Sequence, residues 1–321
     1  MITMKLKATM RASVLAFSAL AAVAAAAEYA PVDVEMRLKQ VSKHVYYVQG
    51  AAGIATDNAG FISNAGFVVT PEGVAVIDAL GTPSLAAKML GLIREITSAP
   101  IRYAIATHYH ADHILGLQVF EGAGAEILGP TGSREYLEGL GKERLEERRF
   151  SLDPWVNDQT RLVWPTRWVE SELKLELGGI QLTVTPQGAA HSKGDLTVYV
   201  EPDRVLFAGD LIFEGRTPFL GDANSRRWLE NLEQMQTTGV AALVPGHGPA
   251  AMRPTEAIGA TRDYLAYLRE QMGAGVAELQ GFDDTYSGVD WSRFANWPAF
   301  EEANRRNAYQ VFLSMEAELF K

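Results

Sequence analysis

One short stretch, IRYAIATHYHADH at residues 101–113, decides how this sequence folds. Residues 101–107 have the pattern of a buried strand that runs directly into the following loop. That loop holds three histidines and one aspartate within six residues, namely His108, His110, Asp112 and His113. Imidazole nitrogens and carboxylate oxygens are metal ligands, and the end of a strand places all four on one short curve. The stretch therefore predicts a metal site at the edge of a sheet rather than a solvated polar loop.

Other residues of the same chemical type follow other predicted strands. The chain has six histidines, and all except His44 lie just past a predicted strand. His191, Asp210 and His247 come from three separate segments, and glycines occur in each of these segments. Because loops gather at the carboxyl ends of strands in parallel or mixed sheets, such distant segments can converge on one site. We expect His44, which lies outside every motif, to have an ordinary structural or surface role.

Strand and helix patterns alternate along the chain and indicate layers of helix on sheet. Between the two halves, residues 143–170 carry Trp155, Trp164 and Trp168 among many charges. This segment is interpreted either as an apolar lid beside the metal site or as local packing. The expected strands are 41–48, 60–70, 73–80, 101–107, 173–184, 196–200, 205–207 and 241–244, and the expected helices are 83–97, 114–120, 225–237, 255–272 and 298–320.

Composition narrows the classes of function. The 321 residues, 47% of them hydrophobic, suffice for one large domain or two small ones. With 29 Lys+Arg against 39 Asp+Glu the formal charge is −10, so nucleic acid is not expected as a partner. The absence of cysteine excludes disulfides, thiolate ligands, Fe–S clusters and a cysteine nucleophile. Any metal must therefore be held by His, Asp or Glu.

Residues 1–27 have the pattern of a signal peptide for export. Lys5, Lys7 and Arg11 precede an Ala-rich apolar stretch that ends in three alanines before Glu28. This stretch is shorter than the roughly 20 strongly apolar residues that a membrane span needs. We therefore expect a periplasmic or secreted protein of residues 28–321, without a stable membrane anchor after cleavage.

The order of these motifs resembles the metallo-β-lactamase superfamily. The resemblance runs from about residue 41 to 250 and implies an α/β (α+β) fold, the four-layer αββα sandwich, with C-terminal helices as an extension of the same domain. It implies a first metal held by His108, His110 and His191, and a second held by Asp112, His113 and His247. Asp210 would bridge the two metals. Asp78, which follows the run 74–77, is similar to the buried aspartate of the family, which orients the ligand loop and supports catalysis.

The chemistry of this ligand set suits two Zn²⁺ ions per chain. Zinc takes imidazole and carboxylate ligands, and it lowers the pKa of a bound water to about 7. A metal-bound hydroxide is then expected to attack the carbonyl of an ester, thioester, lactone or lactam, while Asp112 both binds metal and can accept a proton. The charge of the two cations lets the site receive a small anionic substrate inside an acidic protein.

Three alternatives remain open on the sequence. Asp210 resembles the bridging aspartate of class II glyoxalases, lactonases and quinoprotein-relay-type zinc metallohydrolases, whereas antibiotic-cleaving members have cysteine or no bridging ligand there. Weak or true β-lactamase activity is the first alternative. A His/Asp site also accepts iron, so a mononuclear iron persulfide dioxygenase is the second. A binding module without catalysis is the third.

Overall fold

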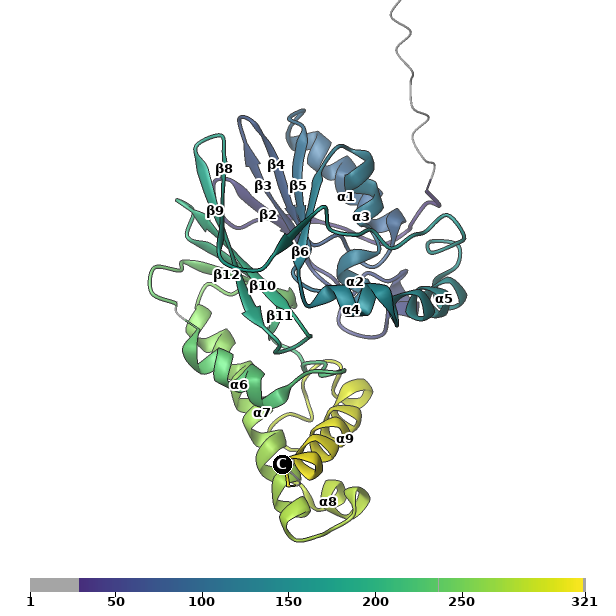
Figure 1. Cartoon of the computed structure of the whole chain (residues 1–321), viewed down its shortest axis with the longest axis vertical. Coiled ribbons are helices and arrows are strands. Elements are labelled where there is room, and N and C mark those ends of the chain that lie inside the picture. The colour runs from purple at the N-terminus through teal and green to yellow at the C-terminus, as the bar shows by residue number, and fades with distance from the viewer. Residues whose placement is uncertain (1–28, 236, 320–321) are drawn as a thin grey trace, which may run out of the picture.

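The computed structural model describes residues 29–235 and 237–319 of the chain. The expected signal peptide lies outside these residues, so its prediction stays untested. Within the described part, two β-sheets of seven and five strands stack face to face, with helices on their outer faces (Figure 1). None of the helices there has the length and hydropathy of a membrane-spanning segment.

The first sheet has the strand order β1-β2-β3-β4-β5-β6-β7. Its first four strands pair antiparallel, and β4 to β7 pair parallel. The strands are β1 Leu38–Gln40, β2 Val45–Val48, β3 Ala65–Thr70, β4 Gly73–Ile77, β5 Ile101–Ile105, β6 Glu126–Pro130 and β7 Arg167–Val169. The helices between them are the 3-10 helix η1 Ala55–Asn58, and α1 Pro83–Ile96, α2 Ala111–Ile114, α3 Leu117–Gly122, α4 Ser133–Glu138 and α5 Gly141–Leu152.

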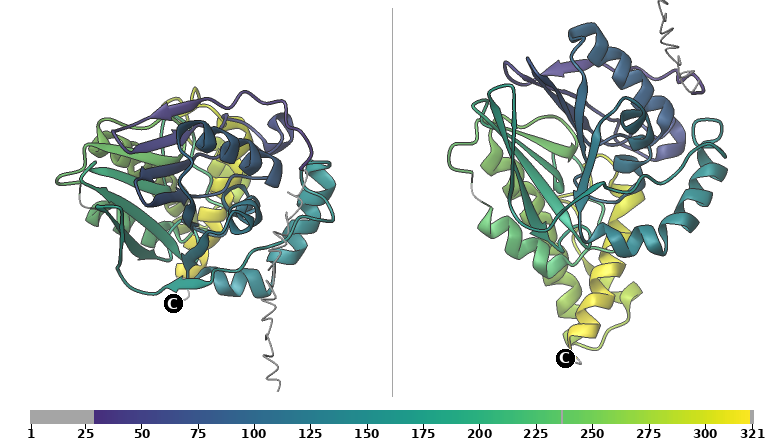
Figure 2. Two further views of the ribbon diagram at one scale, coloured as in Figure 1. Left: turned by 90° about the horizontal axis from the view of Figure 1, so that it is seen from above. Right: turned by 45° about the horizontal axis from the view of Figure 1, so that its top comes forward.

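The second sheet has the order β12-β11-β10-β9-β8, with β11 and β12 parallel and the other pairs antiparallel. Helices α8 and α9 pack with α7 at the C-terminal end of the molecule (Figures 1 and 2). The elements are β8 Leu173–Leu177, β9 Ile180–Gly188, β10 Asp195–Glu201, β11 Val205–Phe213, α6 Ser225–Gln234, β12 Ala242–His247, α7 Pro254–Ala277, α8 Phe282–Gly288 and α9 Phe300–Glu318.

Alternation along the strands explains why the molecule has four layers. Successive side chains of a strand point to opposite faces of its sheet. In β4, Val76 packs in the core shared with α1 and α3, whereas Ile77 packs between the two sheets. In β11, Leu206 packs in the core shared with α6 and α7, and Phe207 packs between the sheets. Both sheets are thus apolar on both faces, which confirms the expected αββα sandwich.

Several predicted boundaries are wrong. Residues 60–64 form a turn rather than the start of a strand, and the side chain of Asn64 there accepts a hydrogen bond from the N–H of Gly50 (3.2 Å). Strand β11 continues past residue 207 to Phe213, with a register shift at Gly209, whose φ is 52°. Asp210 therefore lies within a strand and not in a loop after it. The elements that were not predicted are β1, β6, β7, η1, α2, α4, α5 and α8.

His44 and the tryptophan segment make structural contacts. His44 lies between β1 and β2, where its Nδ1 lies 2.7 Å from a carboxylate oxygen of Asp203. Trp155 donates a hydrogen bond to the carbonyl of Pro31 (3.0 Å), and the rings of Trp164 and Trp168 meet edge to face. These contacts favour local packing over a lid.

Candidate metal centre

Six of the seven residues predicted as ligands lie at or after the carboxyl ends of strands in the two sheets, and Asp210 lies within a strand. His108 and His110 lie in the loop after β5, and Asp112 and His113 follow in the short helix α2. The second sheet supplies the other three: His191 lies between β9 and β10, Asp210 lies in β11, and His247 is the last residue of β12. The site therefore lies on the seam between the two sheets.

Two glycines allow the second sheet to approach this seam. A Cβ at Gly246 would collide with the carboxylate of Asp210 and with the backbone of Gly209. Gly209 itself has a left-handed φ of 52°, and a Cβ there would lie 2.7 Å from Oγ1 of Thr107. Glycine is the residue that meets both demands, since it lacks a Cβ and adopts positive φ without strain.

The first group of donors contains three histidines. His110 Nδ1 lies 3.1 Å from His108 Nε2 and 2.9 Å from His191 Nε2. These nitrogens and one oxygen of Asp210 all lie within 4.8 Å of one another. Three imidazole nitrogens that converge on one point in this way match the donor set of a zinc site.

The second group contains Asp112, His113 and His247, whose donor atoms also lie within 4.8 Å of one another. Asp112 Oδ2 is 3.3 Å from His247 Nε2 and 3.6 Å from His113 Nε2.

Asp210 touches both groups. Its Oδ2 lies 3.2 Å from Nε2 of His191 in the first group and 3.2 Å from Nε2 of His247 in the second. Its Oδ1 lies 3.1 Å from Nε2 of His113. A carboxylate in this position can offer one oxygen to each of two cations.

The seven donors fit divalent cations. His113 Nε2 and Asp210 Oδ1 are buried without a hydrogen-bond partner, although buried polar atoms nearly always have one. A cation between these donors would satisfy both atoms. The chain thus places a metal-binding cluster of His and Asp where the sequence predicted it, while the assignment of each residue to a particular ion stays a prediction.

Comparison with known proteins identifies the family. The family model described as "Metallo-beta-lactamase superfamily" matches residues 58–247, which is more than half of the chain. This chain belongs to the metallo-β-lactamase superfamily.

Curated relatives within this superfamily act on different bonds. A linear primary-alkylsulfatase of Pseudomonas sp. is 22% identical over 243 residues, 64% of this chain and 45% of the relative. The human acyl-coenzyme A thioesterase MBLAC2 is 30% identical over 156 residues, 45% of this chain and 55% of the relative. The chain spans about half the length of these curated relatives.

Solved structures support the superfamily fold. The sec-alkylsulfatase Pisa1 of Pseudomonas sp. matches 87% of this chain and 50% of its own, with a TM-score of 0.65 and 16% identity. A metallo-β-lactamase of Pontibacter korlensis matches 72% of this chain and 99% of its own, with a TM-score of 0.57 and 20% identity.

Each histidine of the predicted metal site directs one ring nitrogen toward the other donors. In most of them the second ring nitrogen contacts a partner that orients the ring. Such partners fix the tautomer and the direction of the ligand nitrogen. Only the ring of His191 lacks one among the described residues, and it packs edge to face on Trp228, with centroids 5.0 Å apart. The other contacts are His113 Nδ1 to Asp78 Oδ2 (2.9 Å), His108 Nδ1 to Thr107 Oγ1 (3.0 Å), His247 Nδ1 to the carbonyl of Ile62 (2.7 Å) and His110 Nε2 to Asp222 Oδ1 (3.3 Å).

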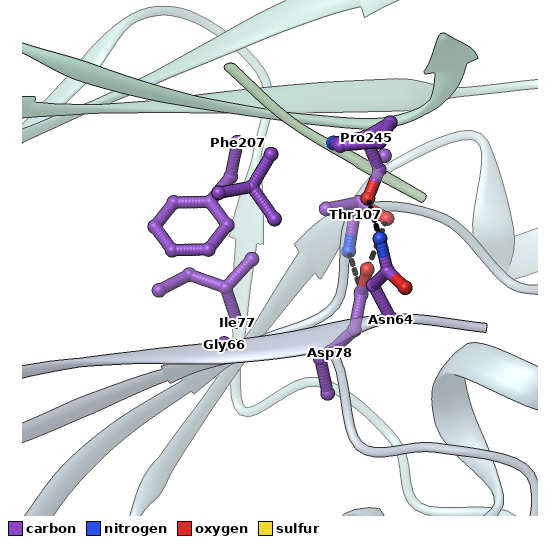
Figure 3. A pocket seen from close by; sticks show the side chains of 10 residues that line it. Asn64, Gly66, Ile77, Asp78, Thr107, Phe207 and Pro245 are labelled. Carbon is purple, nitrogen blue, oxygen red and sulfur yellow. Dashed lines mark hydrogen bonds between the residues drawn. The ribbon is translucent and has the colours of Figure 1, made fainter. Parts of the chain in front are cut away.

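Asp78 ties the ligand loop to the first sheet (Figure 3). Besides the bond to His113, its carboxylate accepts hydrogen bonds from the backbone N–H of Thr107 (2.7 Å) and from the Thr107 hydroxyl (2.9 Å). Nearby, Asn64 donates to the carbonyl of Pro245 (2.8 Å), which joins the first sheet to the strand that carries His247. The structure thus places Asp78 beneath the ligands, in the orienting position that the resemblance implies.

Burial and charge act differently on the two groups. Burial lowers the pKa of His108 and that of His191, the latter to about 3, so both imidazoles keep a free lone pair at neutral pH. Burial also lowers the pKa of His113 and of His247, but the neighbouring carboxylates together outweigh it. Asp210, Asp78 and Asp112 raise the pKa of His113, and Asp210 and Asp112 raise that of His247. The histidines in turn hold the pKa of Asp210 well below its usual value against the effect of burial, so its carboxylate stays ionised.

Two residues of one loop, 214–224, lie at or near the site but were not predicted from the sequence. Asp222 accepts a hydrogen bond from the hydroxyl of Tyr109 (2.6 Å) and contacts His110. Arg216 is buried in the same loop. The loop follows β11, which carries Asp210, so the rule that found the histidines at strand ends points to these two residues as well.

Proposed function

We propose that this chain is an exported dinuclear zinc hydrolase that cleaves an ester, thioester, lactone or lactam bond in a small-molecule substrate. The observation that carries the proposal is the position of Asp210, whose two oxygens contact donors of both groups at 3.1–3.2 Å. A carboxylate between two cations lowers their mutual repulsion and holds them close enough to act together.

Two bound zinc ions would supply a nucleophile from water at neutral pH and a Lewis acid for the substrate oxygen. The residues of the chain position these ions and decide from which side substrate arrives. The side chains of His110 and Asp112 are 20% and 17% exposed, whereas those of the other five predicted ligands are 5% exposed or less. Substrate therefore approaches over His110 and Asp112, which fits the predicted catalytic role of Asp112.

The relatives indicate which substrates to test first. The similarity to an acyl-coenzyme A thioesterase supports a thioester, and the similarity to a linear primary-alkylsulfatase adds a sulfate ester to the bonds to be tested. The bridging aspartate supports a thioester over a lactam, since it resembles that of class II glyoxalases, whereas antibiotic-cleaving members differ at this position. Export to the periplasm or beyond is supported by the pattern of residues 1–27 alone.

A substrate panel tests the proposal. Residues 28–321, loaded with zinc, would be assayed with chromogenic thioesters, lactones, sulfate esters and β-lactams, and the metal content would be measured on the same sample. We expect close to two zinc ions per chain and hydrolysis of at least one class. His247→Ala should lose a metal and most of the turnover, whereas His44→Ala, the matched change outside the site, should keep both. One iron per chain with oxygen uptake on persulfides would contradict the proposal and favour the dioxygenase.

A further inference from the structure

A buried asparagine of the C-terminal helices contacts the loop 214–224. Helix α9 lies beyond residues 58–247, which the family model matches, and its residue Asn307 is fully buried. The side chain of Asn307 accepts a hydrogen bond from the N–H of Leu220 (3.0 Å) and donates one to the carbonyl of Pro218 (2.6 Å). Asn307 therefore pairs with two backbone groups in the middle of the loop.

These two contacts require the amide of an asparagine. Pro218 and Leu220 are buried, and buried backbone groups without a partner are rare because they lose the hydrogen bonds of water. The N–H of Leu220 needs an acceptor, whereas the carbonyl of Pro218 needs a donor. An aspartate could not donate to the carbonyl, and an alanine would provide neither contact. A third hydrogen bond, donated to the hydroxyl of Tyr264 on α7 (2.9 Å), fixes the orientation of the amide.

The loop turns directly after the residues that Asn307 contacts. The N–H of Ala223 donates to the carbonyl of Leu220 (2.7 Å), which closes a turn over residues 220–223. Gly221 in this turn has a left-handed φ of 49°, which glycine adopts without strain. Asp222 is the third residue of the turn, so the position of its carboxylate depends on where Leu220 is fixed.

The turn brings Asp222 to the predicted metal centre. Its carboxylate accepts a hydrogen bond from the hydroxyl of Tyr109 (2.6 Å) and lies 3.3 Å from Nε2 of His110. The other ring nitrogen of His110, Nδ1, faces the donors of the first group. An outer partner fixes the tautomer and the direction of a ligand histidine. A continuous chain of contacts therefore leads from Asn307 through the turn to His110.

We propose that Asn307 is a positioning residue, which keeps Asp222 in contact with His110 and thereby directs a metal ligand from a C-terminal helix. This inference rests on the metal binding of the proposed function, but the effect of Asn307 on the loop can be measured in metal-free protein. It gives the helices beyond residue 247 a role in the metal centre.

Asn304 provides a matched control on the same helix. It is also fully buried, and its side chain forms hydrogen bonds with the hydroxyls of Tyr264 (2.9 Å) and Tyr286 (3.1 Å) rather than with the loop. The experiment compares the wild type with Asn307→Ala, Asn304→Ala, Asp222→Ala and the double variant Asn307→Ala/Asp222→Ala. Amide hydrogen exchange of residues 218–224 is measured in excess chelator. The two binding constants for zinc are measured by competition with a chromogenic chelator.

Both asparagine variants should lower the melting temperature, because each removes hydrogen bonds from the same buried network. Only Asn307→Ala should speed the exchange of residues 218–224, by about 3- to 10-fold, which corresponds to one net hydrogen bond. Asp222→Ala should weaken one of the two zinc constants by about 10- to 100-fold, as for other lost outer partners. Asn307→Ala should weaken the same constant by less, about 3- to 10-fold, since it displaces this partner without removing it. In the double variant Asn307→Ala should add nothing to the effect of Asp222→Ala.

Equal exchange of residues 218–224 in the wild type and Asn307→Ala would overturn the proposal, as would unchanged zinc constants. A purely structural role predicts that Asn307→Ala and Asn304→Ala weaken zinc binding alike and that the effects of Asn307→Ala and Asp222→Ala add. If Asn307→Ala does not fold, Asn307→Ser, whose hydroxyl can still bond one of the two backbone groups, takes its place. If the wild type binds no zinc, the proposed hydrolase fails, and the exchange rates alone decide whether Asn307 fixes the loop.

Discussion

Replacing Asp78 by Asn should remove a metal without removing the fold. Asp78 is buried and accepts three hydrogen bonds, from the Thr107 backbone, the Thr107 hydroxyl and Nδ1 of His113. In Asp78→Asn one of the two oxygens becomes an NH₂ donor. The Thr107 hydroxyl can rotate and accept from it, but the N–H of His113 cannot.

The conflict is resolved by a change of tautomer in His113. Its Nδ1 then accepts from the amide, and the proton moves to Nε2, the atom that faces Asp210 at 3.1 Å. A protonated Nε2 cannot bind a cation. We expect the affinity of the second metal to fall by at least the 10- to 100-fold typical of lost outer partners. The free energy of unfolding should fall by only about 1–3 kcal/mol. Each kcal/mol lowers the melting temperature by about 2–4 °C.

Asp203 provides a matched control for this prediction. Its carboxylate also accepts from a hydroxyl, a backbone N–H and an imidazole, those of Ser42 and His44. Metal affinity would be measured by competition with a chromogenic chelator, and melting temperature in excess chelator. Asp78→Asn and Asp203→Asn should both lower the melting temperature, but only Asp78→Asn should weaken metal binding. Full metal affinity in Asp78→Asn, or an equal loss in both variants, would refute the argument.

Three further predictions follow from the same geometry. Asp210→Ala should lose one metal and reduce turnover at neutral pH by orders of magnitude, whereas Asp210→Cys should keep some activity. Two tightly held metals in Asp210→Ala would disprove the bridging role. Hydrogen bonds from Ser42 and His44 outweigh burial and hold the pKa of Asp203 below its usual value, so this carboxylate adds stability at neutral pH that is lost as the pH falls through its lowered pKa. The difference in unfolding free energy between wild type and Asp203→Asn should therefore shrink below about pH 4. Mass spectrometry of protein from the periplasm should find an N-terminus at or near Glu28, and a full-length cytoplasmic product would contradict export.

Local signals predicted some elements well. Helix α1 is predicted at 83–97 and spans Pro83–Ile96. The prediction succeeds because residues close together in the sequence determine both the start of the helix and its buried face. The Thr82 side chain accepts from the N–H of Leu85 (3.1 Å), and Leu85, Met89 and Ile93 form the buried stripe. Most of the predicted ligands were found for a related reason, since they lie at or shortly after the end of a strand that is visible in the sequence, whereas Asp210 lies within β11.

Elements whose form depends on distant contacts were not predictable. β6, Glu126–Pro130, ends in glycine and proline, and it is a strand because β5 and β7 pair with it on either side. Arg216 and Asp222 lie in a loop without periodicity, and their importance arises from the neighbours that the fold brings to them. The place of Arg216 after β11 indicates that it lies near the site, but a charged loop residue is most often solvated, so its low exposure of 7% could not be predicted.

Because the site lies on the seam between the two sheets, metal binding requires both halves of the chain to be in contact. The first half of the chain, up to β7, brings His108, His110, Asp112 and His113, while the second half, from β8 onward, brings His191, Asp210 and His247. Neither half holds all the residues of either group of donors. If the chain were cut at the exposed residues 170–172, the two fragments would associate and dissociate reversibly. A metal that only the associated form binds would shift this equilibrium toward association. The concentration of free metal would then decide whether the halves form one molecule.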